Sequence, residues 1–239
     1  MAREIDAERR RRALRIVRQL AAAYPDARCA LDFRDPFELL VATILSAQCT
    51  DKKVNEVTPA LFARYPTPAA LAAAPPDAVE AMIRPTGFYR QKARAIQATA
   101  RELAERFDGR VPGTMEELLT LHGVARKTAN VVLGNAFGVP GLTVDTHMKR
   151  VNARLGLTDE EDPVKIEREL MALIPQKDWT AYSHRVIHHG RVCCDARKPR
   201  CEDCPLAADC PWPRARAGVG GVAASAARAK SAPARSARR

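Results

Sequence analysis

Residues 114–150 constrain the fold more than any other stretch of the chain. Thr114 followed three residues later by Glu117 forms a capping box, which is a common start of a helix, and an apolar run comes after it. Residues 122–125 interrupt the apolar spacing, and residues 126–136 resume it. Two helices joined by a short, glycine-containing hairpin leave backbone N–H groups unpaired at the start of the second helix, where the helix dipole is positive. The sequence therefore predicts a seat for a phosphate group made mainly by the backbone.

The remaining segments also favour helices. The clearest start is Asp35, which precedes Pro36 and lies three residues before Glu38, because Asp is a good N-cap and Pro suits the first helical position. Asp51 is predicted to cap the next helix. No run of residues alternates between apolar and polar, so no β-sheet is expected. The sequence predicts an all-α fold, with the longer helices over residues 7–24, 36–45, 51–65, 91–107 and 178–191.

The formal net charge of +11 indicates an acidic partner, but the charge is unevenly distributed. Residues 214–239 hold seven basic residues and no acidic one, which leaves +4 for the rest of the chain. This tail has almost no large apolar residue, so we expect it to be disordered. It is either an electrostatic tether to nucleic acid or a solvated extension without a role. The chain shows no signal peptide and no apolar run of about 18 residues, so no membrane span is expected.

The cysteines form a compact metal-ligand pattern. Four of the seven follow the spacing C-x6-C-x2-C-x5-C, as Cys194, Cys201, Cys204 and Cys210. Disulfides are not expected without secretion. Four thiolates suit either a zinc ion or a [4Fe-4S] cluster, although common zinc motifs use two close cysteine pairs and this loop has one. Arg197 and Lys198 lie between the first two cysteines and are candidate phosphate contacts. The other cysteines are expected to be small buried residues.

The hairpin and the cysteine loop resemble those of a known family. The run L-H-G-V-A-R-K-T-A-N-V-V-L followed by V-D-T-H resembles the helix–hairpin–helix and catalytic Asp of the endonuclease III family of DNA base-excision repair glycosylases. The cysteine spacing matches that family's cluster loop, so the resemblance favours a [4Fe-4S] cluster over zinc. The family's hairpin usually reads L-P-G-V-G-R-K-T-A, so this chain has His122 in place of Pro and Ala125 in place of Gly. Alanine is strained there if the position requires a positive φ. Gly123, Ala125 and Arg126 become candidate DNA contacts.

The resemblance also implies the catalytic residues, Lys127 and Asp145. A neutral Lys127 amine would attack C1′ of the sugar, expel the base and form a Schiff base, from which β-elimination breaks the strand. A free lysine is almost wholly protonated at neutral pH, so the helix N-terminus, neighbouring Arg126 and partial burial are expected to favour the neutral amine. Asp145 would stabilise positive charge on the sugar. Taken alone, Lys127 would be read as a solvated charge and Asp145 as a helix N-cap.

Two loops resemble the elements with which the family fills the gap left by an extruded base. S-A-Q-C-T-D is similar to the family's S-A-Q-x-T-D, which assigns Gln48 to the gap in the duplex. G-F-Y is similar to the family's G-L-Y, which makes Phe88 the wedge beside the unpaired base. Without the resemblance, Phe88 would be read as a core anchor for the helix that follows.

The resemblance covers about residues 7–213 and implies two helical domains. A six-helix barrel over residues 29–139 would carry the hairpin, residues 1–28 and 140–213 would form the cluster domain, and duplex DNA would lie across the cleft between them. The implied substrates are oxidised pyrimidines and abasic sites in double-stranded DNA. We expect a monomer located in the cytoplasm and associated with the nucleoid.

Three alternatives remain open at this point. An adenine-mismatch glycosylase shares the hairpin, the Asp and the cluster, but typically lacks the Lys and carries an extra C-terminal domain. A thymine-mismatch glycosylase usually has Tyr in place of the Lys. A non-catalytic helix–hairpin–helix module would use the hairpin only to bind phosphate.

Overall fold

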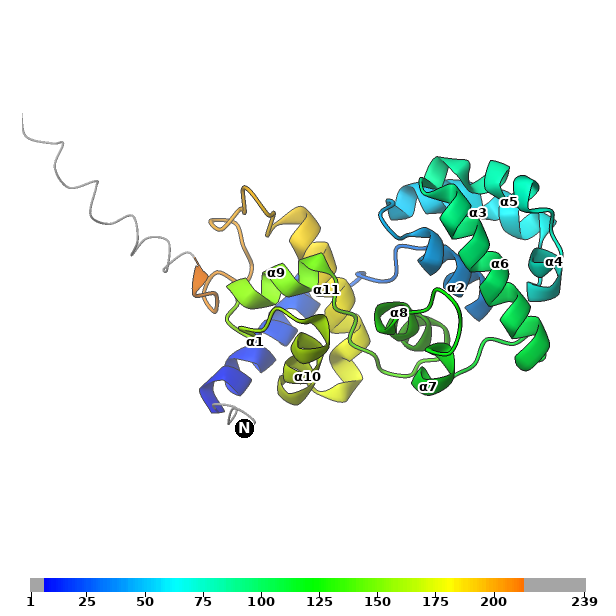
Figure 1. The fold of residues 1–239 in the computed structure, drawn as a ribbon. Helices are drawn as coiled ribbons and strands as arrows, with labels where there is room; N and C mark the ends of the chain where they lie inside the picture. The colour runs from blue at the N-terminus through cyan, green and yellow to red at the C-terminus, as the bar shows by residue number, and fades with distance from the viewer. Residues whose placement is uncertain (1–6, 213–239) are drawn as a thin grey trace, which may run out of the picture.

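The computed structural model describes residues 7–212, and this part of the chain is entirely helical. It contains no β-strand, which confirms the predicted all-α fold (Figure 1). The predicted disordered tail, residues 214–239, lies outside the described residues. The helices are α1 (Ala7–Ala23), α2 (Pro36–Leu45), α3 (Asp51–Arg64), α4 (Pro68–Ala72), α5 (Pro76–Ile83), η1 (Arg84–Thr86), α6 (Tyr89–Arg106), α7 (Met115–Leu118), α8 (Arg126–Ala136), α9 (Thr146–Arg154), α10 (Pro163–Leu173), η2 (Gln176–Asp178) and α11 (Trp179–Val192).

The helix starts follow the capping rules with small shifts. The Asp35 side chain accepts a hydrogen bond from the Glu38 N–H, as predicted. The predicted cap of α3 is wrong by one residue: Thr50 is the N-cap, because its hydroxyl accepts from the Lys53 N–H, and Asp51 is the first helical residue. Helix α6 begins at Tyr89, two residues before the predicted start.

The helices form two lobes, each with its own hydrophobic core. The first, which we call the barrel lobe, comprises α2 to α8, and its buried core residues run from Leu31 to Leu133. The second, the cysteine lobe, packs α1 against α9, α10 and α11, and its core combines residues of α1 with residues from Leu142 to Leu206. Figure 1 shows the N-terminal helix beside α11, so the two ends of the described chain meet in the cysteine lobe.

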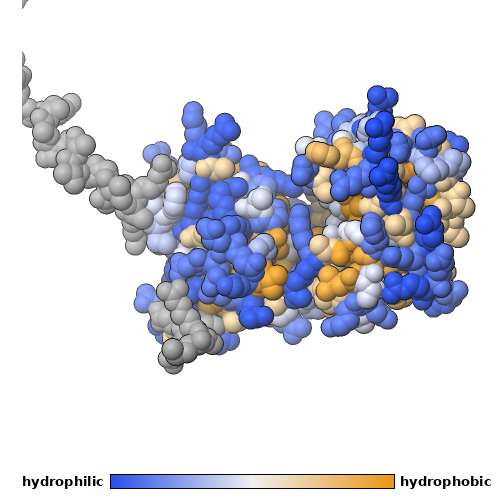
Figure 2. Space-filling model, in the orientation of Figure 1, coloured by the Kyte–Doolittle hydropathy of each residue, from blue (hydrophilic) through white to orange (hydrophobic). Residues whose placement is uncertain are grey.

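The surface is mainly hydrophilic on the face drawn in Figure 2, with apolar patches on both lobes. Among residues 7–212, no helix has the length and apolar character needed to cross a membrane. The chain passes between the lobes after α1 and again after α8, and the second passage leads from the end of α8 to Asp145. The fold therefore places the two predicted catalytic residues on either side of one lobe junction.

Candidate active site

The hairpin between α7 and α8 has the geometry expected of a phosphate seat. Thr114 caps α7 by accepting from the Glu117 N–H at 3.3 Å, although α7 is shorter than the apolar run suggested. Gly123 has φ +74°, a conformation that favours glycine. Ala125 has φ −97° and extended backbone, so alanine is not strained where relatives usually have glycine. The N–H groups at the start of α8 have no side-chain cap.

His122, the other departure from the family pattern, attaches the hairpin to α6. Its N–H donates to Glu102 Oε2 at 2.7 Å, and its carbonyl accepts from Thr99 Oγ1 at 2.6 Å. Proline has no N–H and could not make the first of these bonds. The substitution therefore adds a contact that fixes the hairpin on the barrel lobe.

Lys127 and Asp145 line one cleft between the lobes, with a volume of about 580 Å³. Lys127 is exposed in the first turn of α8, so the predicted partial burial of its amine is wrong, because its side chain lies on the solvent side of this helix. Asp145 Oδ1 accepts from the Met148 N–H at 2.8 Å and so caps α9, while Oδ2 lies 3.1 Å from His147 Nδ1. Capping therefore occupies only one carboxylate oxygen, and the side chain still reaches the cleft.

The segment before Asp145 is held from both lobes. The Asn130 amide on α8 donates to the Leu142 carbonyl at 3.1 Å. The Ser183 hydroxyl on α11 accepts from the Thr143 N–H at 3.0 Å. A Cβ atom at position 141 would lie only 2.9 Å from Asn130 Oδ1. The absence of a side chain at Gly141 therefore lets this segment pass close to Asn130. These contacts fix the entry of the chain into Asp145.

Arg126, predicted to contact DNA, is engaged within the protein. Its Nε and Nη2 donate to the two carboxylate oxygens of Glu167 on α10, at 2.7 and 2.9 Å. Glu167 is buried, and it also accepts from Asn130 at 3.1 Å. The charge of Arg126 is therefore paired across the two lobes, which weakens the expectation that it favours a neutral amine at Lys127.

The two loops predicted to fill the DNA gap are exposed and have left-handed backbone. Gln48 is exposed with φ +51°. Phe88 is 64% exposed with φ +47°, so its reading as a core anchor is wrong. The sequence analysis did not place any basic residue beside Phe88. In the structure, the guanidinium carbons of Arg84 and Arg90 lie 5.8 and 5.6 Å from the centre of the neighbouring Tyr89 ring.

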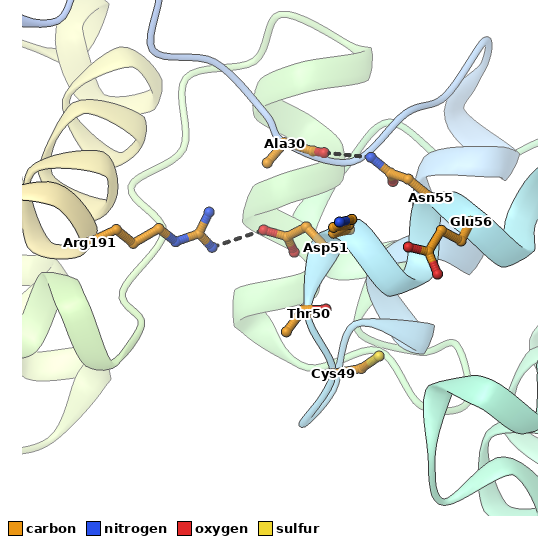
Figure 3. Close-up of a pocket in the computed structure, with 8 residues that line it drawn as sticks. Ala30, Cys49, Thr50, Asp51, Asn55, Glu56 and Arg191 are labelled. Atoms are coloured by element: carbon orange, nitrogen blue, oxygen red, sulfur yellow. Dashed lines mark hydrogen bonds and ion pairs between the residues drawn. The ribbon is translucent and has the colours of Figure 1, made fainter.

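The sequence analysis assigned no role to two further side chains that line the cleft, His184 and Arg191. His184 lines the cleft, and burial lowers its pKa, so it is neutral at pH 7. Arg191 on α11 donates to Asp51 at 2.8 Å and joins the two lobes beside the cleft (Figure 3). Neither His184 nor Arg191 belongs to a recognisable sequence motif, so only the folded structure shows that both line the cleft.

The four predicted metal ligands line a single cavity, together with Cys193 and His189. A single zinc ion held by four thiolates needs sulfur atoms about 3.8 Å apart, given Zn–S distances of about 2.3 Å. Among residues 7–212, the three ligand atoms that lie within 4.8 Å of one another belong to His189, Cys193 and Cys204, a set that includes only one of the four cysteines. The four cysteines are thus not gathered at the separation that a single ion requires, and four thiolates around one cavity suit a [4Fe-4S] cluster. Burial raises the pKa of the Cys204 thiol, and a bound cation would stabilise its thiolate.

The other cysteines only partly match expectation. Cys193 is buried and lies in the cavity, whereas Cys29 and Cys49 are half-buried beside the barrel core. The basic loop between the ligands is shaped by Asp195, which accepts from the N–H groups of Arg197 and Lys198 at 2.8 and 3.0 Å. Both basic side chains are exposed.

Comparisons with known proteins agree with this geometry. Residues 41–176 match the family model of the HhH-GPD superfamily base excision DNA repair proteins, and residues 194–210 match the iron-sulfur binding domain of endonuclease III. The chain is 58% identical over 206 residues to endonuclease III of Synechocystis, which covers 86% of this chain and 94% of that protein. It is 46% identical over 188 residues to endonuclease III of Bacillus subtilis, which covers 78% of this chain and 86% of that protein.

Solved structures give the same result. A non-covalent endonuclease III–DNA complex and a trapped endonuclease III–DNA covalent intermediate each match with a TM-score of 0.83 and 44% identity. Each match covers 87% of this chain. It covers 97% of the protein chain in the non-covalent complex and 98% of the chain in the covalent intermediate. A thermostable thymine-DNA glycosylase, at 23% identity and a TM-score of 0.79, shares the fold.

Fold, hairpin and cleft thus define a helix–hairpin–helix protein of base excision DNA repair. Within that class the chain belongs to the endonuclease III family. Its cofactor is a [4Fe-4S] cluster.

The cofactor gives a direct prediction about composition. Purified protein is expected to be yellow-brown, with broad absorption in the blue, and to contain about four iron atoms per chain, as a cubane cluster requires. Metal analysis by mass spectrometry checks this. Protein that contained zinc and no iron would contradict it.

Proposed function

We propose that the protein is a bifunctional DNA glycosylase and abasic-site lyase that removes oxidised pyrimidines from double-stranded DNA. The observation that carries the proposal is the placement of Lys127 and Asp145 in one cleft, the first at a hairpin that binds phosphate and the second on the opposite lobe. The related structure of a trapped endonuclease III–DNA covalent intermediate supports a nucleophilic mechanism.

Lys127 supplies the nucleophile. Its amine attacks C1′ of the extruded nucleotide, and the bond between C1′ and the base breaks, so the base leaves with that electron pair and takes up a proton. Opening of the sugar ring gives an imine between Nζ and C1′. Loss of a proton from C2′ then expels the 3′ phosphate and breaks the strand.

Asp145 is the electrostatic partner. Its carboxylate stabilises the positive charge that develops on the sugar as the base leaves, and Oδ2, which does not cap α9, can assist proton transfer. His147, at 3.1 Å from Oδ2, helps to orient the carboxylate.

The remaining site residues bind the duplex. The backbone of Gly123 and Ala125 and the α8 N-terminus hold a phosphate, while exposed Arg197 and Lys198 contact the backbone further along. Gln48 and Phe88 fill the vacated stack. Arg126 acts mainly through Glu167 and contributes less to DNA binding than its position suggests.

The same proposal assigns the cluster and the larger organisation. The ligands are Cys194, Cys201, Cys204 and Cys210, and the cluster holds the basic loop in place instead of reacting with the substrate. The domains are residues 29–139 and, together, residues 1–28 and 140–213, limits within which every residue of the two cores falls. We propose a monomer that acts in the cytoplasm, associated with the nucleoid where its substrate lies.

Borohydride trapping tests the proposal. Wild-type protein mixed with duplex DNA containing an abasic site is expected to give one covalent protein–DNA species after reduction of the imine. A monofunctional mismatch glycosylase would release a base without trapping, and a non-catalytic module would do neither. Either result with cluster-loaded protein would overturn the assignment.

Phe88→Ala is expected to slow excision of an oxidised base about tenfold or more while leaving cleavage at an existing abasic site within about threefold, because only excision must open an intact stack. Single-turnover assays on both substrates check this. Phe137→Ala removes a partly exposed ring outside the cleft and serves as the control. Equal loss on both substrates would mean that Phe88 does not act as a wedge.

A further inference from the structure

A buried lysine lies beneath the Phe88 loop. Lys92, in the first turn of α6, is 5% exposed, and its ammonium donates to the Thr86 carbonyl at 2.7 Å. Burial lowers the pKa of the Lys92 ammonium, because removing the charged form from water is unfavourable. A lysine near a helix N-terminus is also unfavourable for the helix dipole. Neither the hairpin nor the cleft chemistry uses this residue.

The Thr86 carbonyl is the point where the wedge loop begins. Helix α5 continues into η1, and Thr86 is the last residue of that helical segment. Carbonyl groups at a helix C-terminus lack partners within the helix and carry partial negative charge, which favours a cation beside them. Thr86 is itself buried, and its hydroxyl donates to the Ile83 carbonyl at 2.8 Å. The ammonium therefore caps this segment from inside the protein.

The two residues that follow have unusual backbone. Gly87 has φ +69°, and Phe88 has φ +47°. A non-glycine residue adopts such a conformation only where its surroundings fix it. Phe88 is 64% exposed, so its own ring is held by few contacts. Its carbonyl accepts the first backbone bond of α6, from the Lys92 N–H at 3.0 Å, while the Lys92 side chain holds the start of the loop at Thr86.

We propose that Lys92 is a positioning residue for base removal, because its ammonium fixes the Thr86 carbonyl and so presents Phe88 to the duplex in a defined orientation. This inference rests on the wedge role proposed for Phe88. Lys92 itself touches neither the substrate nor the reacting atoms. Its effect is confined to the step that opens the base stack.

Lys92→Met keeps the apolar stem and removes the ammonium. It is expected to slow single-turnover excision of an oxidised pyrimidine about tenfold and to leave β-elimination at a preformed abasic site within about twofold of the wild-type rate. The Phe88→Ala/Lys92→Met double variant is expected to excise no more slowly than Phe88→Ala alone, within about twofold, because residues that act through one another are not additive. Independent, additive losses would overturn the proposal.

Gln97→Met is the matched control. Gln97 is a buried residue of the same helix whose side chain donates to the Ala74 carbonyl at 2.8 Å, away from the wedge loop. Loss of the Gln97 side-chain amide is expected to lower Tm, and to change the rates of base excision and of abasic-site cleavage by the same factor. If Lys92→Met likewise slows both reactions in parallel with Tm, the residue has only a structural role. Should Lys92→Met fail to fold, Lys92→Gln provides the same comparison, because it also removes the charge.

The two proposals fail in different ways. If Phe88→Ala shows no difference between the substrates, the wedge role itself is wrong. If Phe88→Ala discriminates between them and the Lys92 variants do not, only the positioning role is wrong.

Discussion

Lys127→Gln is expected to abolish borohydride trapping and strand cleavage while DNA binding survives. The substitution removes the amine that forms the imine, with little change in side-chain length. Lys127 is exposed in the first turn of α8, so the fold and the neighbouring phosphate seat should be preserved. Trapping yield on abasic-site duplex measures the chemistry, and fluorescence anisotropy with the same duplex measures binding.

Lys165→Gln provides the matched control. Lys165 is also an exposed lysine in the first turn of a helix, α10, but it does not line the cleft. This variant is expected to trap like the wild type. Trapping that persisted in Lys127→Gln would assign the nucleophile to another amine. Parallel loss of trapping and binding would mean that Lys127 serves mainly to hold the phosphate.

Much of this site follows from rules that act over a few residues. The N-caps at Thr114 and Asp145 depend only on neighbouring residues, so the sequence predicted both of them. The positive φ of the hairpin lies at Gly123 and not at position 125, where the sequence analysis had considered it. The four cysteines are also close in sequence, and their spacing alone indicated a metal site. The resemblance to a known family then supplied the roles of Lys127 and the wedge loops, which no local rule contains.

Contacts between distant residues could not be predicted in this way. The pair of Arg126 and Glu167 joins residues 41 positions apart, and it makes Arg126, predicted only as a DNA contact, a link between the lobes as well. His122 meets Glu102 because the hairpin packs on α6, which depends on the completed barrel. The burial of Lys92 has the same origin, since an amphipathic pattern places a lysine on a solvated face.

The Arg126–Glu167 pair also explains how the cleft keeps its shape. Glu167 is buried and accepts from both Arg126 and Asn130, the residues that flank Lys127 on α8. Asn130 in turn donates to Leu142, three residues before Asp145. One buried carboxylate therefore connects the helix of the nucleophile with the segment that leads to its partner. Removing Arg126 would leave the buried Glu167 carboxylate with fewer donors, so the pair is expected to stabilise this connection.

Asp145→Asn is expected to slow base excision about 10²- to 10³-fold with the fold intact, because it removes the charge that stabilises the sugar cation. Asn caps helices about as well as Asp, so the bond from the Met148 N–H should persist and the free energy of unfolding should change by less than about 0.5 kcal/mol. Single-turnover excision and thermal unfolding of the same preparation separate the two roles of this residue.

Asp162→Asn is the control for capping alone. Asp162 caps α10 by accepting from the Val164 and Lys165 N–H groups, each at 3.0 Å, and does not line the cleft. The free energy of unfolding of Asp162→Asn should equal that of Asp145→Asn. Its rate of base excision should equal that of the wild type. If Asp145→Asn excised bases at the wild-type rate, Asp145 would be a cap and nothing more, and the positive charge on the sugar would have to be stabilised by another group in the cleft. A large loss of rate without a loss of stability, seen only at Asp145, is the result that a catalytic carboxylate requires.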